Sequence, residues 1–255
     1  MKRYRGYLID LDGTMYRGEE RIDAAVRFVR RLAEEKIPYL FVTNNSTKPP
    51  EQVAEKLNRF GIPATKDSVF TTSMATANYI YQWKKDAKIY FIGEEGLKLA
   101  LMEKGFAFAG EDAECVVVGL DRQVTYEKFA VACLAIRNGA RFISTNGDIA
   151  LPTERGLMPG NGALTALVRV STGTEPVFIG KPEPIIVEQA LQVLGTKKEE
   201  TLLVGDNYAT DILAGIRAGI DTLLVFSGVT KKEDLQKVEQ MPTYAVDSLD
   251  EWTVL

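Results

Sequence analysis

Short apolar segments alternate with amphipathic segments along nearly the whole chain. The apolar segments have no polar face, and the stretches between them repeat apolar residues at helical spacing, as at Ala25, Phe28, Val29, Leu32 and Ala33. Strands that are buried on both faces and joined by helices form parallel sheets covered on both sides, so we predict an α/β fold. We expect strands at 4–10, 38–43, 88–93, 115–120, 141–145, 176–180, 201–206 and 222–226. We expect helices at 24–36, 50–60, 74–83, 97–104, 126–138, 163–170, 184–194 and 211–218.

The 255-residue chain contains no histidine and only two cysteines. The lack of histidine excludes Ser-His-Asp and Cys-His catalysis, histidine proton transfer and histidine metal ligands. Cys115 and Cys133 lie in apolar segments, so we expect them to be core residues without a disulfide, and they are too few for a cysteine zinc site. Any bound metal must therefore be held by oxygen atoms, which favours magnesium, calcium or manganese.

The net charge and the hydropathy of the chain limit the kinds of partner that this protein is expected to bind. A net charge of −4 does not favour general nucleic-acid binding, which usually shows a basic surplus. No apolar run approaches the roughly 20 residues that a membrane-spanning helix needs. The basic N-terminus lacks the long apolar region of a signal peptide. We expect a cytoplasmic protein without a nucleic-acid or membrane partner.

Polar clusters directly follow four of the apolar segments. Any one of them is typical of a turn. Sites in parallel α/β sheets lie beyond the carboxyl ends of the strands, and four such clusters are hard to explain as turns alone. The clusters are Asp10-Leu11-Asp12-Gly13-Thr14, Thr43-Asn44-Asn45-Ser46, Gly180-Lys181-Pro182 and Gly205-Asp206-Asn207, with Asp211 close behind.

Together these clusters predict a phosphoryl-transfer site. Asp10 and Asp206 can share one hard divalent cation with the backbone carbonyl of Asp12, and the cation offsets the repulsion between clustered carboxylates. The Thr43 hydroxyl, the amides after it and the Lys181 ammonium can hold phosphate oxygens. A carboxylate beside the phosphorus can act as a nucleophile, and a second one can protonate the leaving oxygen.

The order and spacing of these motifs resemble the haloacid dehalogenase superfamily over essentially the whole chain. The segment TNGD…P…PGNGAL (145–164) resembles the branch of NagD-like and p-nitrophenyl phosphatases, which carries a type-2 cap. The resemblance implies a Rossmann-like parallel-sheet core from 1–79 and 176–255, with an inserted α/β cap domain at 80–175. The four superfamily motifs are DLDGT (10–14), VTNNS (42–46), GKPEP (180–184) and GDNYATDI (205–212).

The resemblance also implies roles for single residues. Asp10 resembles the nucleophile that forms an aspartyl phosphate, and Asp12 resembles the general acid and base. Asp10, the Asp12 carbonyl and Asp206 resemble the ligands of Mg²⁺. The phosphate-binding residues of the family correspond to Thr43, Asn44 and Lys181, and supporting positions to Asn45, Asn207 and Asp211.

The cap segment holds weaker candidates. Asn146 and Asp148 follow an expected strand and resemble residues that face the leaving group of the substrate, while a turn is the alternative. Arg155 could meet an anionic substrate or be simply solvated. PGNGALT (159–165) lacks the third glycine of a dinucleotide fingerprint, so we expect a turn that opens a helix.

These observations predict a Mg²⁺-dependent phosphatase whose partner is a small-molecule phosphate ester, such as p-nitrophenyl phosphate, a sugar phosphate or a nucleotide. The alternatives are a phosphomutase on the same scaffold and a phosphate-binding protein that has lost catalysis. Dehalogenation is disfavoured because it needs neither a second aspartate nor a metal. The physiological substrate and the oligomeric state stay open, with a homodimer among the alternatives.

Overall fold

The computed structural model describes residues 2–153 and 155–254, which form two compact units. The first unit comprises Met1–Thr43, Glu51–Phe70 and Lys181–Leu255, and the second comprises Asn44–Pro50 and Thr71–Gly180. The core and cap bounds expected from the sequence stay a prediction.

The first unit is built on a six-stranded sheet with the order β15-β14-β13-β1-β4-β5. Strand β1 pairs in parallel with β13 and β4, and β14 pairs in parallel with β13 and β15. The central strands are fully buried, as their continuous apolar sequence predicts. The strands are β1 (Gly6–Ile9), β4 (Tyr39–Thr43), β5 (Val69–Thr71), β13 (Thr201–Gly205), β14 (Asp221–Val225) and β15 (Tyr244–Val246).

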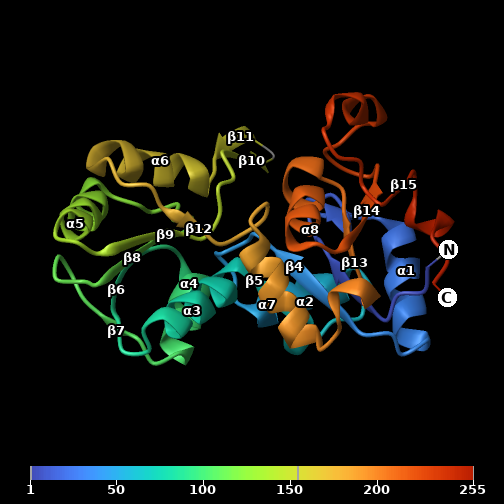
Figure 1. The fold of residues 1–255 in the computed structure, drawn as a ribbon, viewed down its shortest axis with the longest axis horizontal. Coiled ribbons are helices and arrows are strands. Elements are labelled where there is room, and N and C mark those ends of the chain that lie inside the picture. Colours follow the sequence, from blue (N-terminus) through green and yellow to red (C-terminus); the bar gives the residue numbers. More distant parts are fainter. Residues whose placement is uncertain (1, 154, 255) are drawn as a thin grey trace. The chain divides into compact units, whose positions relative to one another are not determined.

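Helices pack on this sheet and complete the core of the first unit (Figure 1). Phe28, Val29 and Leu32 of α1 pack in one cluster with Tyr7 and Ile9 of β1, which explains the helical spacing of these residues. A small hairpin, β2 (Tyr16–Arg17) with β3 (Glu20–Arg21), follows the β1 turn. The helices are α1 (Asp23–Glu34), α2 (Pro50–Arg59), α7 (Pro184–Leu194) and α8 (Leu213–Ala218).

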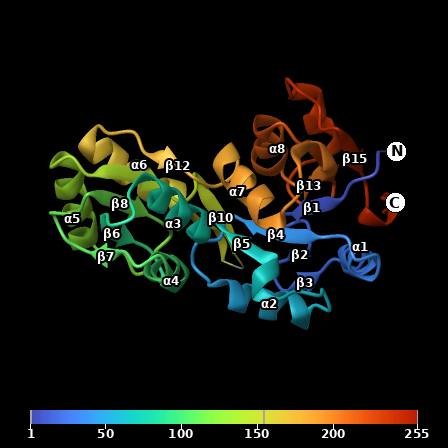
Figure 2. The same ribbon diagram turned by 60° about the horizontal axis from the view of Figure 1, so that its bottom comes forward.

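The ends of the described chain meet in this unit. The Tyr4 ring lies 6.3 Å from the Trp252 ring, and Trp252 Nε1 donates a hydrogen bond to the Tyr7 hydroxyl at 3.3 Å. The segment before β1 therefore lies beside the C-terminal turn, as Figure 2 also shows.

The second unit has its own parallel sheet of five strands, in the order β12-β9-β8-β6-β7. Figure 1 shows α5 and α6 on one face of this sheet and α3 and α4 on the other. An exposed antiparallel hairpin, β10 (Ala150–Thr153) with β11 (Gly156–Pro159), precedes α6. The strands are β6 (Lys88–Ile92), β7 (Ala107–Phe108), β8 (Cys115–Val118), β9 (Arg141–Ser144) and β12 (Val177–Phe178), and the helices are α3 (Thr72–Trp83), α4 (Glu95–Glu103), α5 (Tyr126–Arg137) and α6 (Asn161–Thr172).

The predicted α/β class is confirmed, and most expected elements are present within two or three residues of their expected ends. The sequence analysis missed β2, β3, β5, β7, β10, β11 and β15, which are two to four residues long. All of them except β5 are partly or fully exposed, so no continuous apolar run marks them. Cys115 and Cys133 are both free, and Cys115 is buried as expected, whereas Cys133 is only partly buried. None of the helices in the described ranges is long and apolar enough to cross a membrane.

Candidate active site

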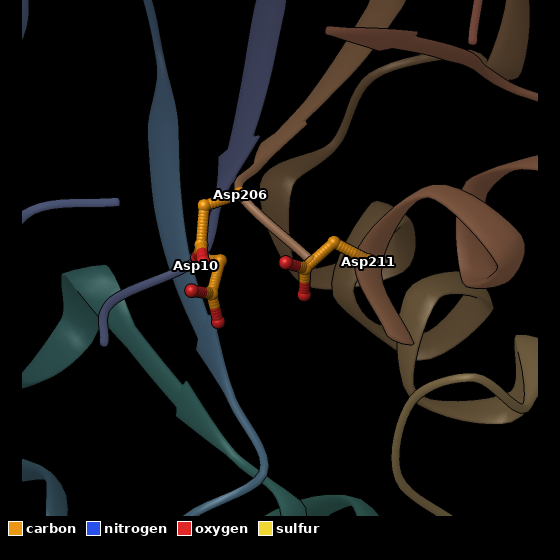
Figure 3. Close-up of side chains that lie close together, drawn as sticks. All are labelled: Asp10, Asp206 and Asp211. Atoms are coloured by element: carbon orange, nitrogen blue, oxygen red, sulfur yellow. The ribbon is translucent and has the colours of Figure 1, made fainter. Parts of the chain in front are cut away.

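Three buried carboxylates gather at the carboxyl edge of the first-unit sheet. Asp10 follows β1 and Asp206 follows the neighbouring strand β13, and Asp10 N donates a hydrogen bond to Val204 O at 2.9 Å. Asp211 lies in the helical turn after β13. Figure 3 shows the three side chains side by side. One carboxylate oxygen from each lies within 4.8 Å of the others, and the residues are 8%, 0% and 1% exposed.

The turn after β1 is shaped to hold this cluster. Thr14 is fully buried, and its hydroxyl lies 3.0 Å from Asp206 Oδ1 and 3.3 Å from Asp10 Oδ2. Gly13 has a φ of +91°, and a Cβ atom there would collide with the Asp206 carboxylate. The other Asp206 oxygen accepts a hydrogen bond from Val229 N at 2.7 Å. The motif DLDGT therefore ends in glycine and threonine because the loop must approach Asp206 closely.

Lys181 supplies the positive charge of the site. It is 2% exposed, and its Nζ lies 2.5 Å from Asp10 Oδ1 and 2.7 Å from Asp211 Oδ1. The same ammonium donates to Val42 O at 3.1 Å, which places it beside the end of β4. Burial lowers the pKa of Lys181, but the charges and hydrogen bonds of Asp10 and Asp211 outweigh it and raise the pKa, so the amine stays protonated.

The charges of this cluster do not balance. Three carboxylates face one ammonium. Burial, followed by the charge of Asp211, raises the pKa of Asp10 well above its ordinary value. The same causes raise the pKa of Asp206 to about 6. An all-oxygen donor set with excess negative charge fits a hard divalent cation, so the residues present could hold such a metal.

Asp12 differs from Asp10 in its surroundings. Asp12 is exposed, whereas Asp10 is buried. The pKa of the Tyr16 phenol is raised, first by burial and then by the charge of Asp12, so the Asp12 carboxylate lies near this ring. The sequence thus places one desolvated and one solvated carboxylate two residues apart, an arrangement that suits a nucleophile and a proton carrier.

Thr43 is buried at the end of β4, next to β1 in the sheet. Asn207 serves its own turn, because its Oδ1 accepts a hydrogen bond from Ala209 N at 3.0 Å while its backbone N donates to Asp211 Oδ2 at 3.0 Å. Seven of the predicted site residues belong to the first unit: Asp10, Asp12, Thr43, Lys181, Asp206, Asn207 and Asp211.

The remaining predicted residues belong to the second unit. Asn146 Nδ2 donates to Asn44 O at 2.9 Å, and Asn44 Nδ2 lies 3.3 Å from both carboxylate oxygens of Asp148. Asn45 Oδ1 accepts hydrogen bonds from Thr47 N at 2.8 Å and from the Thr47 hydroxyl at 2.9 Å, which fixes the turn after Asn44.

Arg155 lies exposed at the tip of the β10–β11 hairpin, where its backbone N donates to Thr153 Oγ1 at 3.2 Å. Its expected contact with an anionic substrate stays a prediction.

Sequence reasoning missed three contributors to these sites. Thr14 lay within a recognised motif but received no role. The backbone N of Val229 has no sequence signal, because every residue except proline offers this donor. Asn161 lay in a segment expected to be a turn that opens a helix and received no role of its own, although its amide is buried and donates to several groups of the second unit.

Comparison with known families decides the assignment. The family model described as haloacid dehalogenase-like hydrolase matches residues 7–107, and the HAD-hydrolase-like model matches residues 178–252. The chain belongs to the haloacid dehalogenase-like hydrolases. The resemblance drawn from the four sequence motifs is thereby confirmed.

Individual haloacid dehalogenase-like proteins match the chain over almost its full length. It is 67% identical over 252 residues to 5'-nucleotidase YutF of Bacillus subtilis, covering 99% of this chain and 98% of the relative. It is 52% identical to an acid sugar phosphatase of Staphylococcus saprophyticus, covering 98% and 97%. A solved structure of a variant of thermostable p-nitrophenylphosphatase from Bacillus stearothermophilus matches with a TM-score of 0.93 and 68% identity, covering 100% of both chains.

Proposed function

We propose that this haloacid dehalogenase-like hydrolase is a Mg²⁺-dependent phosphatase that hydrolyses small phosphate monoesters through an aspartyl-phosphate intermediate. The observation that carries the proposal is the buried cluster of Asp10, Asp206 and Asp211 around the Lys181 ammonium. The similar proteins support the reaction class, since their names describe a 5'-nucleotidase, an acid sugar phosphatase and a p-nitrophenylphosphatase.

Asp10 acts as the nucleophile in this proposal. Its carboxylate oxygen forms a bond to phosphorus while the bond between phosphorus and the leaving oxygen breaks, and Asp12 donates a proton to that oxygen. Asp12 then takes a proton from water, whose oxygen attacks the aspartyl phosphate, releases orthophosphate and restores Asp10. The exposure of Asp12 and the burial of Asp10 support this division of roles.

Asp10, Asp206 and the carbonyl oxygen of Asp12 would hold the Mg²⁺ ion. When bound, the ion supplies positive charge that offsets the carboxylates and the phosphate oxygens. Asp211 acts through its ion pair with Lys181, holding the ammonium beside Asp10. Lys181 in turn shields Asp10 from the like charge of Asp211 and presents positive charge to the phosphate.

Thr43, Asn44 and Lys181 bind the phosphate group in the same proposal, on the strength of the family motifs. Asn146 and Asp148 remain candidates for contact with the leaving group, and their hydrogen bonds to Asn44 support a role near the proposed phosphate-binding residues. We further propose that residues 80–175 act as a cap for a core made of 1–79 and 176–255, and that the protein works in the cytoplasm.

The test is a panel of phosphomonoesters assayed for orthophosphate release with and without Mg²⁺. The panel contains p-nitrophenyl phosphate, several sugar phosphates and several nucleoside 5'-monophosphates, ranked by kcat/KM. We expect orthophosphate release that stops on chelation and returns with added Mg²⁺. Isomerised sugar phosphate without orthophosphate would instead indicate a phosphomutase. Binding of orthophosphate without any turnover would indicate a protein that has lost catalysis.

A further inference from the structure

Asn161 is a buried polar residue at the start of α6, only 1% exposed. Its side-chain amide nitrogen lies 2.8 Å from Asn146 O, 3.0 Å from Ser144 Oγ, 3.2 Å from Val118 O and 3.2 Å from Thr145 Oγ1. Burial of an amide costs stability unless it is hydrogen-bonded, and here its bonds converge on the carboxyl ends of β8 and β9. The residue is therefore placed to hold the chain that leaves these strands.

The glycines on either side of Asn161 hold the same chain through their backbone. Gly160 N donates to Ile149 O at 2.9 Å, and Gly162 N donates to Asp148 O at 2.8 Å. A Cβ atom on Gly160 would collide with Asp148 O, and one on Gly162 would collide with Gly147 O. The segment PGNG thus grips the turn formed by residues 145–148, which we call the 145–148 turn.

Asn44 is held by hydrogen bonds from the 145–148 turn. Asn146 Nδ2 donates to Asn44 O at 2.9 Å, and Asn146 Oδ1 accepts from Asp148 N at 3.1 Å. The Asp148 carboxylate accepts from Asn44 Nδ2 at 3.3 Å. Both the backbone and the side chain of Asn44 are therefore fixed by one short turn.

The same turn also holds the chain that leads to Lys181. Thr145 O accepts a hydrogen bond from Gly180 N at 2.8 Å, and a Cβ atom on Gly180 would press against Asn44 Oδ1 and Thr145 O. Asn44 is the next residue after Thr43, and Gly180 is the residue before Lys181. Two of the proposed phosphate-binding residues are therefore one peptide bond away from groups that the turn fixes.

We propose that Asn161 is a positioning residue for phosphate binding, acting through the 145–148 turn on Asn44 and Gly180. This inference rests on the proposed function, because the proposed function assigns phosphate binding to Thr43, Asn44 and Lys181. The phosphate group is common to every substrate and to the product. Loss of the Asn161 amide should therefore weaken the binding of every one of these ligands, orthophosphate included.

Asn161→Asp tests this directly, since it keeps the shape of the side chain but replaces the N–H donors with a carboxyl oxygen that faces Val118 O and Asn146 O. Holoenzyme with Mg²⁺ is assayed with p-nitrophenyl phosphate and with a sugar phosphate, and orthophosphate binding is measured by calorimetry. We expect KM for both substrates and Kd for orthophosphate to rise together by about tenfold, because misplaced binding groups lose much of their effect.

Two further variants guard against a general loss of folding. Asp148→Ala breaks the link to Asn44 downstream of Asn161, so it should raise the same constants, and combining it with Asn161→Asp should add little. Val168→Ala removes a buried side chain from the same helix α6 in the core of the second unit, and it should lower the melting temperature without raising KM.

The outcomes separate this inference from the proposed function. Unchanged constants in Asn161→Asp, a rise for only one leaving group, additive effects in the double variant, or an equal rise in Val168→Ala would each overturn it. A wild-type protein that binds orthophosphate but hydrolyses no ester would overturn the proposed function. In that case a higher Kd for orthophosphate in Asn161→Asp would still support the positioning role. A wild-type protein that binds no orthophosphate would overturn the inference as well.

Discussion

The two units share one architecture but carry opposite electrostatics at the carboxyl edges of their sheets. In the first unit, three buried carboxylates face the single ammonium of Lys181. In the second, Asp121 is also buried, at 5% exposure, but Lys128 Nζ lies 2.6 Å from its carboxylate. Glu94 is paired likewise with Arg122 at 2.6 Å.

This difference shows what the parallel α/β fold does and does not supply. The fold brings the residues after neighbouring strands to one edge in both units. In the first-unit cluster the three carboxylates exceed the single charge of Lys181, and burial and the charge of Asp211 raise the pKa values of Asp10 and Asp206. Matched substitutions in the two units can therefore compare an edge with excess negative charge and an edge whose charges are paired.

The largest expected effect is that of Asp10→Asn. Removing the proposed nucleophile should lower kcat about a thousandfold or more, while orthophosphate binding persists. The matched control is Asp121→Asn, the same change at the edge whose charges are paired, which should leave kcat near the wild-type value. Orthophosphate release measures both. Near-native turnover in Asp10→Asn would remove this residue from the nucleophile role.

Lys181→Met comes next in size. Loss of the ammonium removes positive charge from the phosphate and leaves Asp10 and Asp211 unpaired, so kcat should fall and KM should rise, with kcat/KM lower by about a hundredfold. Lys128→Met removes the partner of Asp121 in the second unit and should cost stability but not turnover. Steady-state kinetics gives kcat and KM for both variants, and circular dichroism checks that each variant is folded. Unchanged kcat and KM in Lys181→Met would contradict the assignment.

Asp206→Asn and Asp121→Asn should change the melting temperature in opposite directions. Without Mg²⁺, removing one of the crowded carboxylates should raise the melting temperature by about 2–4 °C, equivalent to about 1 kcal/mol. Asp121→Asn should lower it, because that carboxylate is paired with Lys128. Calorimetry of both variants in chelator measures the signs, and a Mg²⁺ titration should show weaker binding only in Asp206→Asn. Shifts of the same sign would refute the charge comparison.

The smallest effect belongs to Glu94→Gln. The hydrogen bonds of Arg122 lower the pKa of Glu94 below its ordinary value of 4.5, although burial opposes them. A carboxyl whose pKa is lowered by folding stabilises the protein above its unfolded-state pKa, and this contribution disappears as the pH falls through the folded-state pKa. Because the Arg122 side chain is 68% exposed, the pair should contribute only about 0.5 kcal/mol.

Urea unfolding of wild-type and Glu94→Gln protein at pH 7 and below pH 4 measures this contribution. The difference in unfolding free energy should be present at pH 7 and should shrink in the acidic range. A difference that grows as the pH falls would show that the pair does not act as an ion pair.

The proximity of several side chains in the cluster around Lys181 could be predicted from the sequence. Asp10, Lys181 and Asp206 each follow an apolar strand, and the geometry of parallel strands alone brings such positions to one edge. Asp211 was found through the spacing of its motif, and its ion pair with Lys181 bears out that it lies at the same place.

Other parts of the sites were out of reach of the sequence. Asn161 donates a hydrogen bond to Asn146 O in the 145–148 turn, and nothing in the sequence of these two segments indicates that they are in contact. The approach of Gly13 to Asp206 and the Val229 amide depend on backbone positions, which residue types do not encode by themselves. The short strands β10 and β11 are too brief and too exposed for periodicity to reveal them.

The sequence by itself determined the α/β class, the succession of the longer strands and helices along the chain, and the residue types that meet at the edge of the first sheet. These follow from hydrophobic period and from the geometry of parallel strands, which are local properties of the chain. Only the tertiary structure decided which charges are balanced, because a carboxylate finds or lacks its counter-ion through contacts between distant segments. The two sheet edges differ in this respect, since the Asp10 cluster has excess negative charge whereas Asp121 is paired with Lys128.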